Sequence, residues 1–115
     1  MASGYLILHG IGHDRPPEHW QFQLAAELVR HGHEVRYPGL PDSHAPALER
    51  WLQALRAEVA ALRCESRVVV CHSLACLLWF HAANRGLDGV GLVDRVLLES
   101  PPESARVPEA GASHR

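Results

Sequence analysis

One stretch near the middle of the chain constrains its fold more than any other. It reads Val68-Val69-Val70-Cys71-His72-Ser73-Leu74-Ala75-Cys76. The β-branched run before His72 favours a buried strand, and the apolar residues after Ser73 recur at helical spacing. The pattern predicts a strand that turns sharply into a helix and holds Ser73 at the bend.

The same two patterns alternate along the rest of the chain. We expect strands over residues 5–9, 34–37, 67–71 and 93–99, and helices over about 17–31, 47–59 and 74–85. The first helix is expected to open at Pro17-Glu18 and to bury Trp20, Leu24, Leu28 and Val29. The βαβαβαβ order predicts an α/β fold with a parallel sheet, right-handed crossovers and helices on both faces.

Composition excludes several classes of function. The 115 residues form at most one domain, which we expect to span residues 1–102, with a frayed tail over 103–115. A formal net charge of -2 gives no electrostatic footprint for nucleic acid or for an anionic membrane, and no apolar run is long enough to span a bilayer. Three cysteines without a C-x-x-C motif, and no signal peptide, indicate a reduced cytoplasmic protein.

Ser73 carries the main chemical hypothesis. A serine at such a bend lies at the carboxyl end of a parallel sheet, where ligands bind, and the N–H groups of the following helix point toward a developing oxyanion. The turn matches the nucleophile pattern G-x-S-x-G, with Cys71 and Ala75 in place of the glycines. The alternative is that Ser73 is a simple N-cap, as in many βα units.

The loop after the first strand, His9-Gly10-Ile11-Gly12, supports the catalytic interpretation. A strand followed by His-Gly is typical of the loop that supplies the second oxyanion-hole N–H. The donors would be the backbone N–H groups of Ile11 and Leu74, although the pattern alone does not decide between Ile11 and Gly12. A plain glycine turn or a degenerate dinucleotide loop is the alternative, but Arg15 stands where the third glycine of G-x-G-x-x-G belongs.

The remaining reactive side chains favour structural roles. His9 and His13 are four residues apart, but a strand end and a glycine loop do not place both on one face, so we expect no metal site. We expect His72 to pack at the bend rather than to act as the base. Cys71 and Cys76 are expected to pack rather than to react.

Several segments, taken in order, resemble a known family. They are Ile7-Leu8-His9-Gly10 with Glu18-His19-Trp20 behind it, residues 37–42, Trp51 and residues 70–76. With them the chain resembles the small single-domain serine hydrolases of the α/β-hydrolase superfamily, the group that includes the retinoblastoma-binding serine hydrolase. The resemblance extends to about Pro102. It implies a three-layer fold without a large lid, a local strand order of 2-1-3-4, and Ser73 as the nucleophile.

The chain departs from this family after Glu99. In α/β-hydrolases an Asp or Glu, and then a His, follow the nucleophile along the chain. Residues 100–115 contain Glu103, Glu109 and His114 but no strand or helix pattern, so no acid or base role is transferred to them. We therefore expect a truncated, N-terminal portion of a hydrolase, whose last strand is an unpaired sheet edge that favours self-association.

Two functions from different classes follow from these patterns. The first is hydrolysis of a small-molecule acyl ester, amide or thioester by Ser73, without a cofactor or metal and incomplete without the acid and base. The alternative is a non-catalytic protein of the same fold, or an inactive fragment, that acts, if at all, by binding a partner. A third class, a flavodoxin-like nucleotide-binding module, would hold a phosphate at the first loop.

Overall fold

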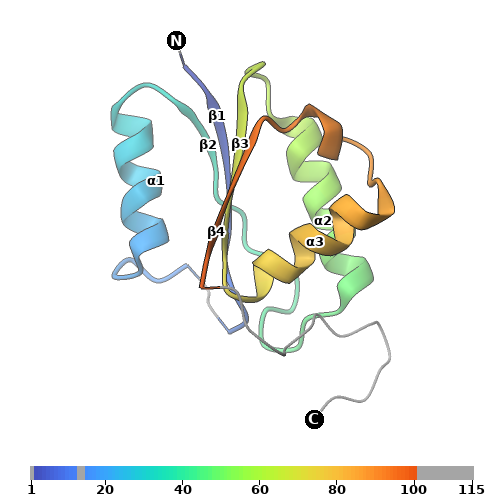
Figure 1. Ribbon diagram of the computed structural model, residues 1–115. Coiled ribbons are helices and arrows are strands. Elements are labelled where there is room, and N and C mark those ends of the chain that lie inside the picture. The colour runs from blue at the N-terminus through green and yellow to red at the C-terminus, as the bar shows by residue number, and fades with distance from the viewer. Residues whose placement is uncertain (1, 13–14, 101–115) are drawn as a thin grey trace.

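Four parallel strands form one sheet with helices on both faces (Figure 1). The structure, a computed structural model, describes residues 2–12 and 15–100. The elements are β1 (Gly4–Leu8), α1 (Trp20–Arg30), β2 (Glu34–Arg36), α2 (Leu48–Ala61), β3 (Arg67–His72), α3 (Leu74–Arg85), the short 3-10 helix η1 (Val90–Leu92) and β4 (Arg95–Glu99). The order across the sheet is β2-β1-β3-β4, which confirms the predicted α/β class and strand order.

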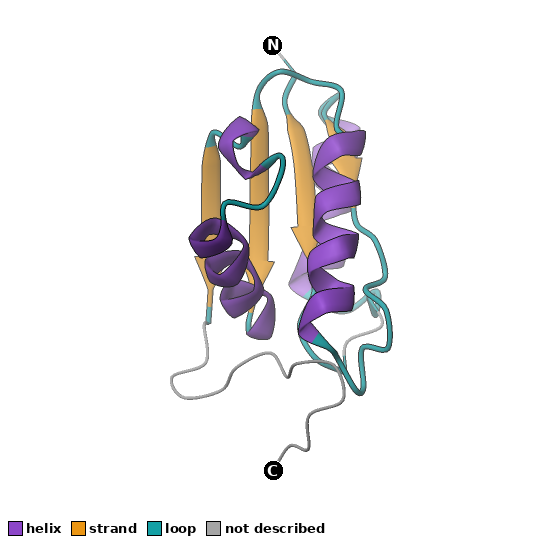
Figure 2. Cartoon of the chain, turned by 90° about the vertical axis from the view of Figure 1, so that its right-hand side faces the viewer, coloured by secondary structure: helices purple, strands orange, loops and turns teal. Residues whose placement is uncertain are grey.

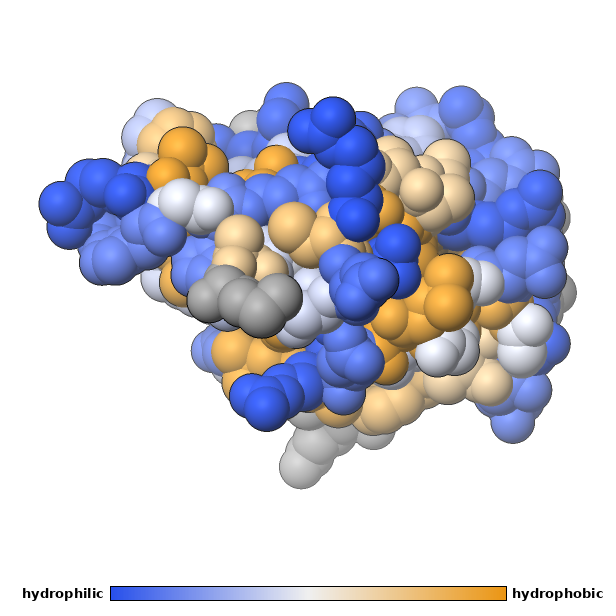
Figure 3. All heavy atoms as spheres, turned by 90° about the horizontal axis from the view of Figure 1, so that it is seen from above, coloured by the Kyte–Doolittle hydropathy of each residue, from blue (hydrophilic) through white to orange (hydrophobic). Residues whose placement is uncertain are grey.

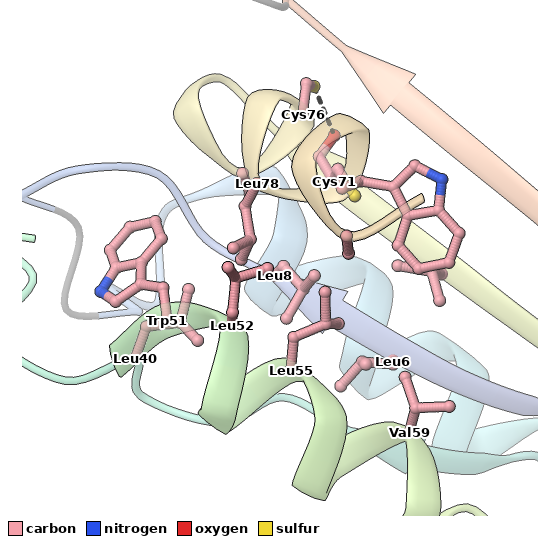
Figure 4. Close-up of a cluster of buried hydrophobic side chains, with 14 of the residues drawn as sticks. Leu6, Leu8, Leu40, Trp51, Leu52, Leu55, Val59, Cys71, Cys76 and Leu78 are labelled. Atoms are coloured by element: carbon pink, nitrogen blue, oxygen red, sulfur yellow. Dashed lines mark hydrogen bonds between the residues drawn. The ribbon is translucent and has the colours of Figure 1, made fainter. Parts of the chain in front are cut away.

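The main core lies between the sheet and the layer formed by α2 and α3, which share one face (Figure 2). Leu6 and Leu8 of β1 point into this layer and meet Trp51 and Leu55 of α2 (Figure 4). All four side chains are fully buried. Because side chains alternate along a strand, the buried Ile7 points to the opposite face, which α1 covers (Figure 1).

The helix α1 differs from its prediction in two ways. It begins at Trp20 rather than at Pro17-Glu18, because the ring Nδ1 of His19 accepts the N–H of Gln21 and caps the helix there. Val29, predicted on the buried stripe, is 60% exposed. The fully buried residue of α1 is instead Gln21, whose side-chain amide donates to the Leu8 carbonyl at 2.9 Å. The inward side of this helix therefore includes a hydrogen bond to the sheet.

The strand β4 is an edge of the sheet that the structure describes (Figure 2). It begins at Arg95, two residues later than predicted, because η1 and a short connection occupy the residues before it. Val96 and Leu98 pack against the core, whereas Leu97, on the other face, is 53% exposed.

Figure 3 views the molecule from the end at which the strands begin. On this face, separate apolar patches lie among hydrophilic residues. Across residues 2–12 and 15–100, no helix has the length and apolar character needed to cross a membrane.

Candidate active site

Ser73 lies between β3 and α3 in a backbone conformation that residues other than glycine rarely adopt. Its φ is 56° and its ψ is -122°. Its N–H donates to the Glu99 carbonyl at 2.9 Å, and its own carbonyl accepts the Cys76 N–H at 2.9 Å. The Ser73 side chain makes no capping hydrogen bond to α3, so the N-cap interpretation does not describe this turn. The hydroxyl is held at the bend by the backbone on both sides.

The two residues that replace the pattern's glycines lie in the protein interior, next to a third residue, Cys76, which carries a thiol. Cys71 and Ala75 are both fully buried, and the Cys76 thiol lies 3.7 Å from the carbonyls of Cys71 and Glu99. Burial raises the pKa of both thiols, Cys71 and Cys76, which keeps them neutral. The structure thus places both sulfurs in packing positions beside the serine.

The loop after β1 lies directly against the serine. A Cβ atom added to Gly10 would stand 3.1 Å from Ser73 Cβ and 3.4 Å from the His72 carbonyl oxygen. Real Cβ atoms rarely approach so closely, so the contact depends on glycine. The predicted oxyanion loop and the predicted nucleophile, far apart in sequence, therefore meet at the carboxyl end of the sheet.

His9, which follows β1, holds this loop in place through hydrogen bonds of its ring. The side chain is buried; its Nε2 accepts the Leu40 N–H at 2.8 Å, and its Nδ1 lies 2.8 Å from the Gly10 carbonyl oxygen. Because Nε2 accepts, Nδ1 must carry the proton and donate to Gly10. The imidazole is thus a neutral connection between the β1 and β2 exit loops.

The same contacts orient the peptide groups of the loop. The Gly10 carbonyl points to His9, so the Ile11 N–H, on the opposite side of that planar trans peptide, points away from His9. The Gly12 N–H donates to the Ser43 carbonyl at 2.7 Å. Leu74 is the first residue of α3, where a backbone N–H has no acceptor within the helix.

A carboxylate that the sequence analysis did not single out lies beside the Ser73 turn. Glu99 ends β4, His72 ends β3, and the two are opposite each other in the parallel register. Nδ1 of His72 forms a short contact with Oε1 of Glu99, and the Ser100 hydroxyl donates to Oε2 at 2.8 Å. The hydrogen bonds from Ser100 and then from His72 lower the pKa of Glu99. The signal that could have found this pair is that neighbouring parallel strands end at the same edge.

The His72 ring is also packed between aromatic side chains of the α1 N-terminus. Its centroid lies 4.7 Å from that of His19 and 5.8 Å from that of Trp20, both in edge-on geometry. The structure thus places His72 in a packed, hydrogen-bonded position at the bend.

Other residues considered from the sequence cannot be placed relative to this site: His13, Glu103, Glu109, His114 and the expected tail lie outside the described residues. Within the described ranges, no group of three or more metal-ligating side chains could hold an ion. A surface hollow of about 670 Å³ lies elsewhere, between α2 and the η1 region, and residues such as Gln53 and Asp88 line it.

Comparison with known proteins gives the family context for this geometry. The chain is similar in structure to the ydeN gene product from B. subtilis, with a TM-score of 0.64 and 24% sequence identity. The match covers 84% of this chain and 50% of that protein, so the chain spans about half the length of this structural relative. No curated protein sequence matches the chain.

A family model provides the match in sequence. The model described as serine hydrolase matches residues 5–114, which include the loop after β1, the Ser73 turn and β4. The chain therefore belongs to the serine hydrolase family.

Proposed function

We propose that Ser73 is the nucleophile of an acyl-transfer reaction, in which a small ester, amide or thioester is cleaved. The observation that carries this proposal is the strained Ser73 backbone, with φ at 56°, in direct contact with the glycine of the loop after β1. Strained, non-glycine residues concentrate at active sites because the surrounding structure must over-determine them. Here that structure includes the Glu99 carbonyl and the Cys76 N–H.

In the proposed reaction Ser73 Oγ bonds to the acyl carbon. The bond to the leaving alcohol, amine or thiol breaks, and the leaving group departs with the proton that the serine loses. Water then attacks the acyl-serine, releases the carboxylic acid and restores the hydroxyl. The developing oxyanion would be held by the backbone N–H groups of Ile11 and Leu74.

Two contacts support Ile11 rather than Gly12 as the first donor. The Gly12 N–H is already bonded to Ser43, and the His9–Gly10 hydrogen bond turns the Ile11 N–H away from His9. Leu74 supplies a second donor from the N-terminus of α3, where the helix dipole also favours negative charge. Removal of one such donor typically costs about 3 kcal/mol of transition-state stabilisation.

We do not assign the general base to His9, His19 or His72, the histidines on the strand ends and loops around Ser73. Ring nitrogens of His9, His19 and His72 bond to Leu40 and Gly10, to the Gln21 N–H, and to Glu99, respectively. We propose that full turnover needs an acid and a base from outside the described residues, so that the described chain alone supplies a nucleophile and an oxyanion hole.

A fluorophosphonate probe tests the nucleophile directly. Ser73 Oγ would attack phosphorus and fluoride would leave, which adds a defined mass to one peptide. We expect labelling of the 115-residue chain at Ser73, its loss in Ser73→Ala, and unchanged labelling in Ser66→Ala, because Ser66 is exposed and precedes β3 at the opposite end from Ser73. Circular dichroism of each variant verifies folding.

The competing function is a non-catalytic, partner-binding protein of the same fold. The hydrogen bonds that His9, His19 and His72 make to groups other than Ser73 favour this alternative. A folded chain that takes up no probe at Ser73, or that is labelled equally after Ser73→Ala, would overturn the nucleophile and leave the binding function.

A further inference from the structure

Within the described residues, no strand pairs with β4 on the side away from β3, and β4 directs backbone groups to that side at defined residues. The Glu99 carbonyl accepts the Ser73 N–H and so points toward β3. Because successive residues of a strand direct their N–H and C=O groups to opposite sides, Arg95 and Leu97 also bond toward β3. The N–H and C=O groups of Val96 and Leu98 therefore point outward, along the edge that lies farthest from β2 in the described sheet.

The sequence of this edge is complementary to itself. β4 reads Arg95-Val96-Leu97-Leu98-Glu99. In an antiparallel pair centred on Leu97, Arg95 of each copy stands opposite Glu99 of the other, and Val96 stands opposite Leu98. An Arg–Glu pair therefore stands at each end of the pairing, with apolar residues between them. Each residue meets the same partner in both copies, as a twofold interface between identical surfaces requires.

The side chains of one face are available for this pairing. Arg95 and Leu97 are exposed, and the Glu99 side chain keeps 42% of its surface accessible beside His72 and Ser100. All three lie on the face opposite α2 and α3, so they remain on a common face when the two sheets join. In the described chain, Arg95 forms no ion pair that would compete.

We propose that β4 pairs antiparallel with β4 of a second copy, about a twofold axis through Leu97, and joins the two four-stranded sheets into one. Val96 and Leu98 exchange both backbone hydrogen bonds with the second copy. The two Leu97 residues form a non-hydrogen-bonded pair, whose Cα atoms lie about 4.5 Å apart in such ladders. Five-residue strands bury little area, so the association is weak and depends on concentration.

Disulfide trapping tests both the pairing and its register in the 115-residue chain. In a Cys64→Ser background, which removes the partly exposed native thiol, Leu97→Cys is expected to form a disulfide dimer on mild oxidation. Arg95→Cys is the matched control on the same face. In the proposed register the two thiols introduced by this control are four positions out of line, about 13 Å apart, which is beyond disulfide reach.

A charge reversal tests the same interface without a new thiol. We expect sedimentation velocity to show a dimer that grows with concentration, and Arg95→Glu to shift it at least about tenfold toward monomer, because that variant places a second carboxylate opposite Glu99 at both ends of the pair. A strictly monomeric wild-type chain, or equal crosslinking at positions 95 and 97, would overturn the proposal. A dimer that Arg95→Glu leaves unchanged would place the interface elsewhere and overturn it as well.

Discussion

The backbone of Ser73 is strained, because its φ is positive and the residue has a Cβ atom. A residue with a Cβ atom in this region of φ and ψ is strained by about 1–3 kcal/mol, whereas glycine adopts positive φ without strain. The bond from its N–H to Glu99 and the bond from Cys76 to its carbonyl hold it there. The chain thus maintains a locally unfavourable turn at the position of the proposed nucleophile.

Two substitutions at this position separate strain from side-chain chemistry. Ser73→Gly relieves the strain and Ser73→Ala keeps it, so we expect the glycine variant to be more stable than the alanine variant by about 1 kcal/mol. Both remove the hydroxyl and both should abolish probe labelling. Urea unfolding measures the difference, and an alanine variant as stable as the glycine variant would contradict the strain at Ser73.

At the scale of elements, one carboxylate connects β2 to the turn that leads into β3. Glu34 accepts the N–H groups of Arg63 and Cys64 at 2.9–3.0 Å. The backbone hydrogen bond from Cys64, followed by that from Arg63, lowers the pKa of Glu34 from its ordinary value of 4.5. The ionised carboxylate is therefore a stabilising connection between two strands that do not pair with each other.

The pH dependence of this connection has a defined sign. Because the folded pKa is lower than the unfolded one, the contribution is present above about pH 4.5 and is lost as pH falls through the folded pKa. We expect Glu34→Gln to lose about 1 kcal/mol at pH 7 and progressively less in acid. Glu65→Gln, at a neighbouring exposed position, is the control. Urea unfolding from about pH 7 to about pH 3 measures both, and a constant difference would contradict the carboxylate's role.

Helices and strands can be predicted where the local sequence pattern determines them. The residues of the candidate site can be predicted only in part. The valine run and the helical spacing after Ser73 specify β3 and α3 without reference to the rest of the chain. The His72–Glu99 pair depends on strand register, which local pattern does not contain. His9 likewise bonds to Leu40, a residue on another loop. The prediction of a buried Val29 is wrong because periodicity gives the apolar side of a helix but not how much of it the sheet covers.

For the molecule as a whole, the strand order predicts which backbone hydrogen bonds of the sheet open least often. β1 and β3 are paired on both sides, whereas β2 and β4 are edges of the described sheet. The Leu6 and Val70 groups bond between the two central strands, since the Gly4 N–H donates to the Ser66 carbonyl on that side and alternate residues follow.

Hydrogen exchange in dilute solution checks this expectation. We expect the amides of Leu6 and Val70 to exchange at least about tenfold more slowly than those of Val96 and Leu98, which face the open edge. Raising the protein concentration should slow only the latter pair if β4 associates as proposed. Uniform protection across all four strands would contradict the ranking.

The bond between the Ser73 N–H and the Glu99 carbonyl also sets an order of events during synthesis. β1, β2 and β3 end by residue 72, whereas the carbonyl that accepts the Ser73 N–H belongs to β4, which begins at Arg95. At a translation rate of about 5–20 residues per second, that strand emerges roughly one to several seconds later. The newly made chain therefore lacks the hydrogen bond from the Ser73 N–H to Glu99 until β4 has docked, so the Ser73 turn is completed only after the described sheet has formed.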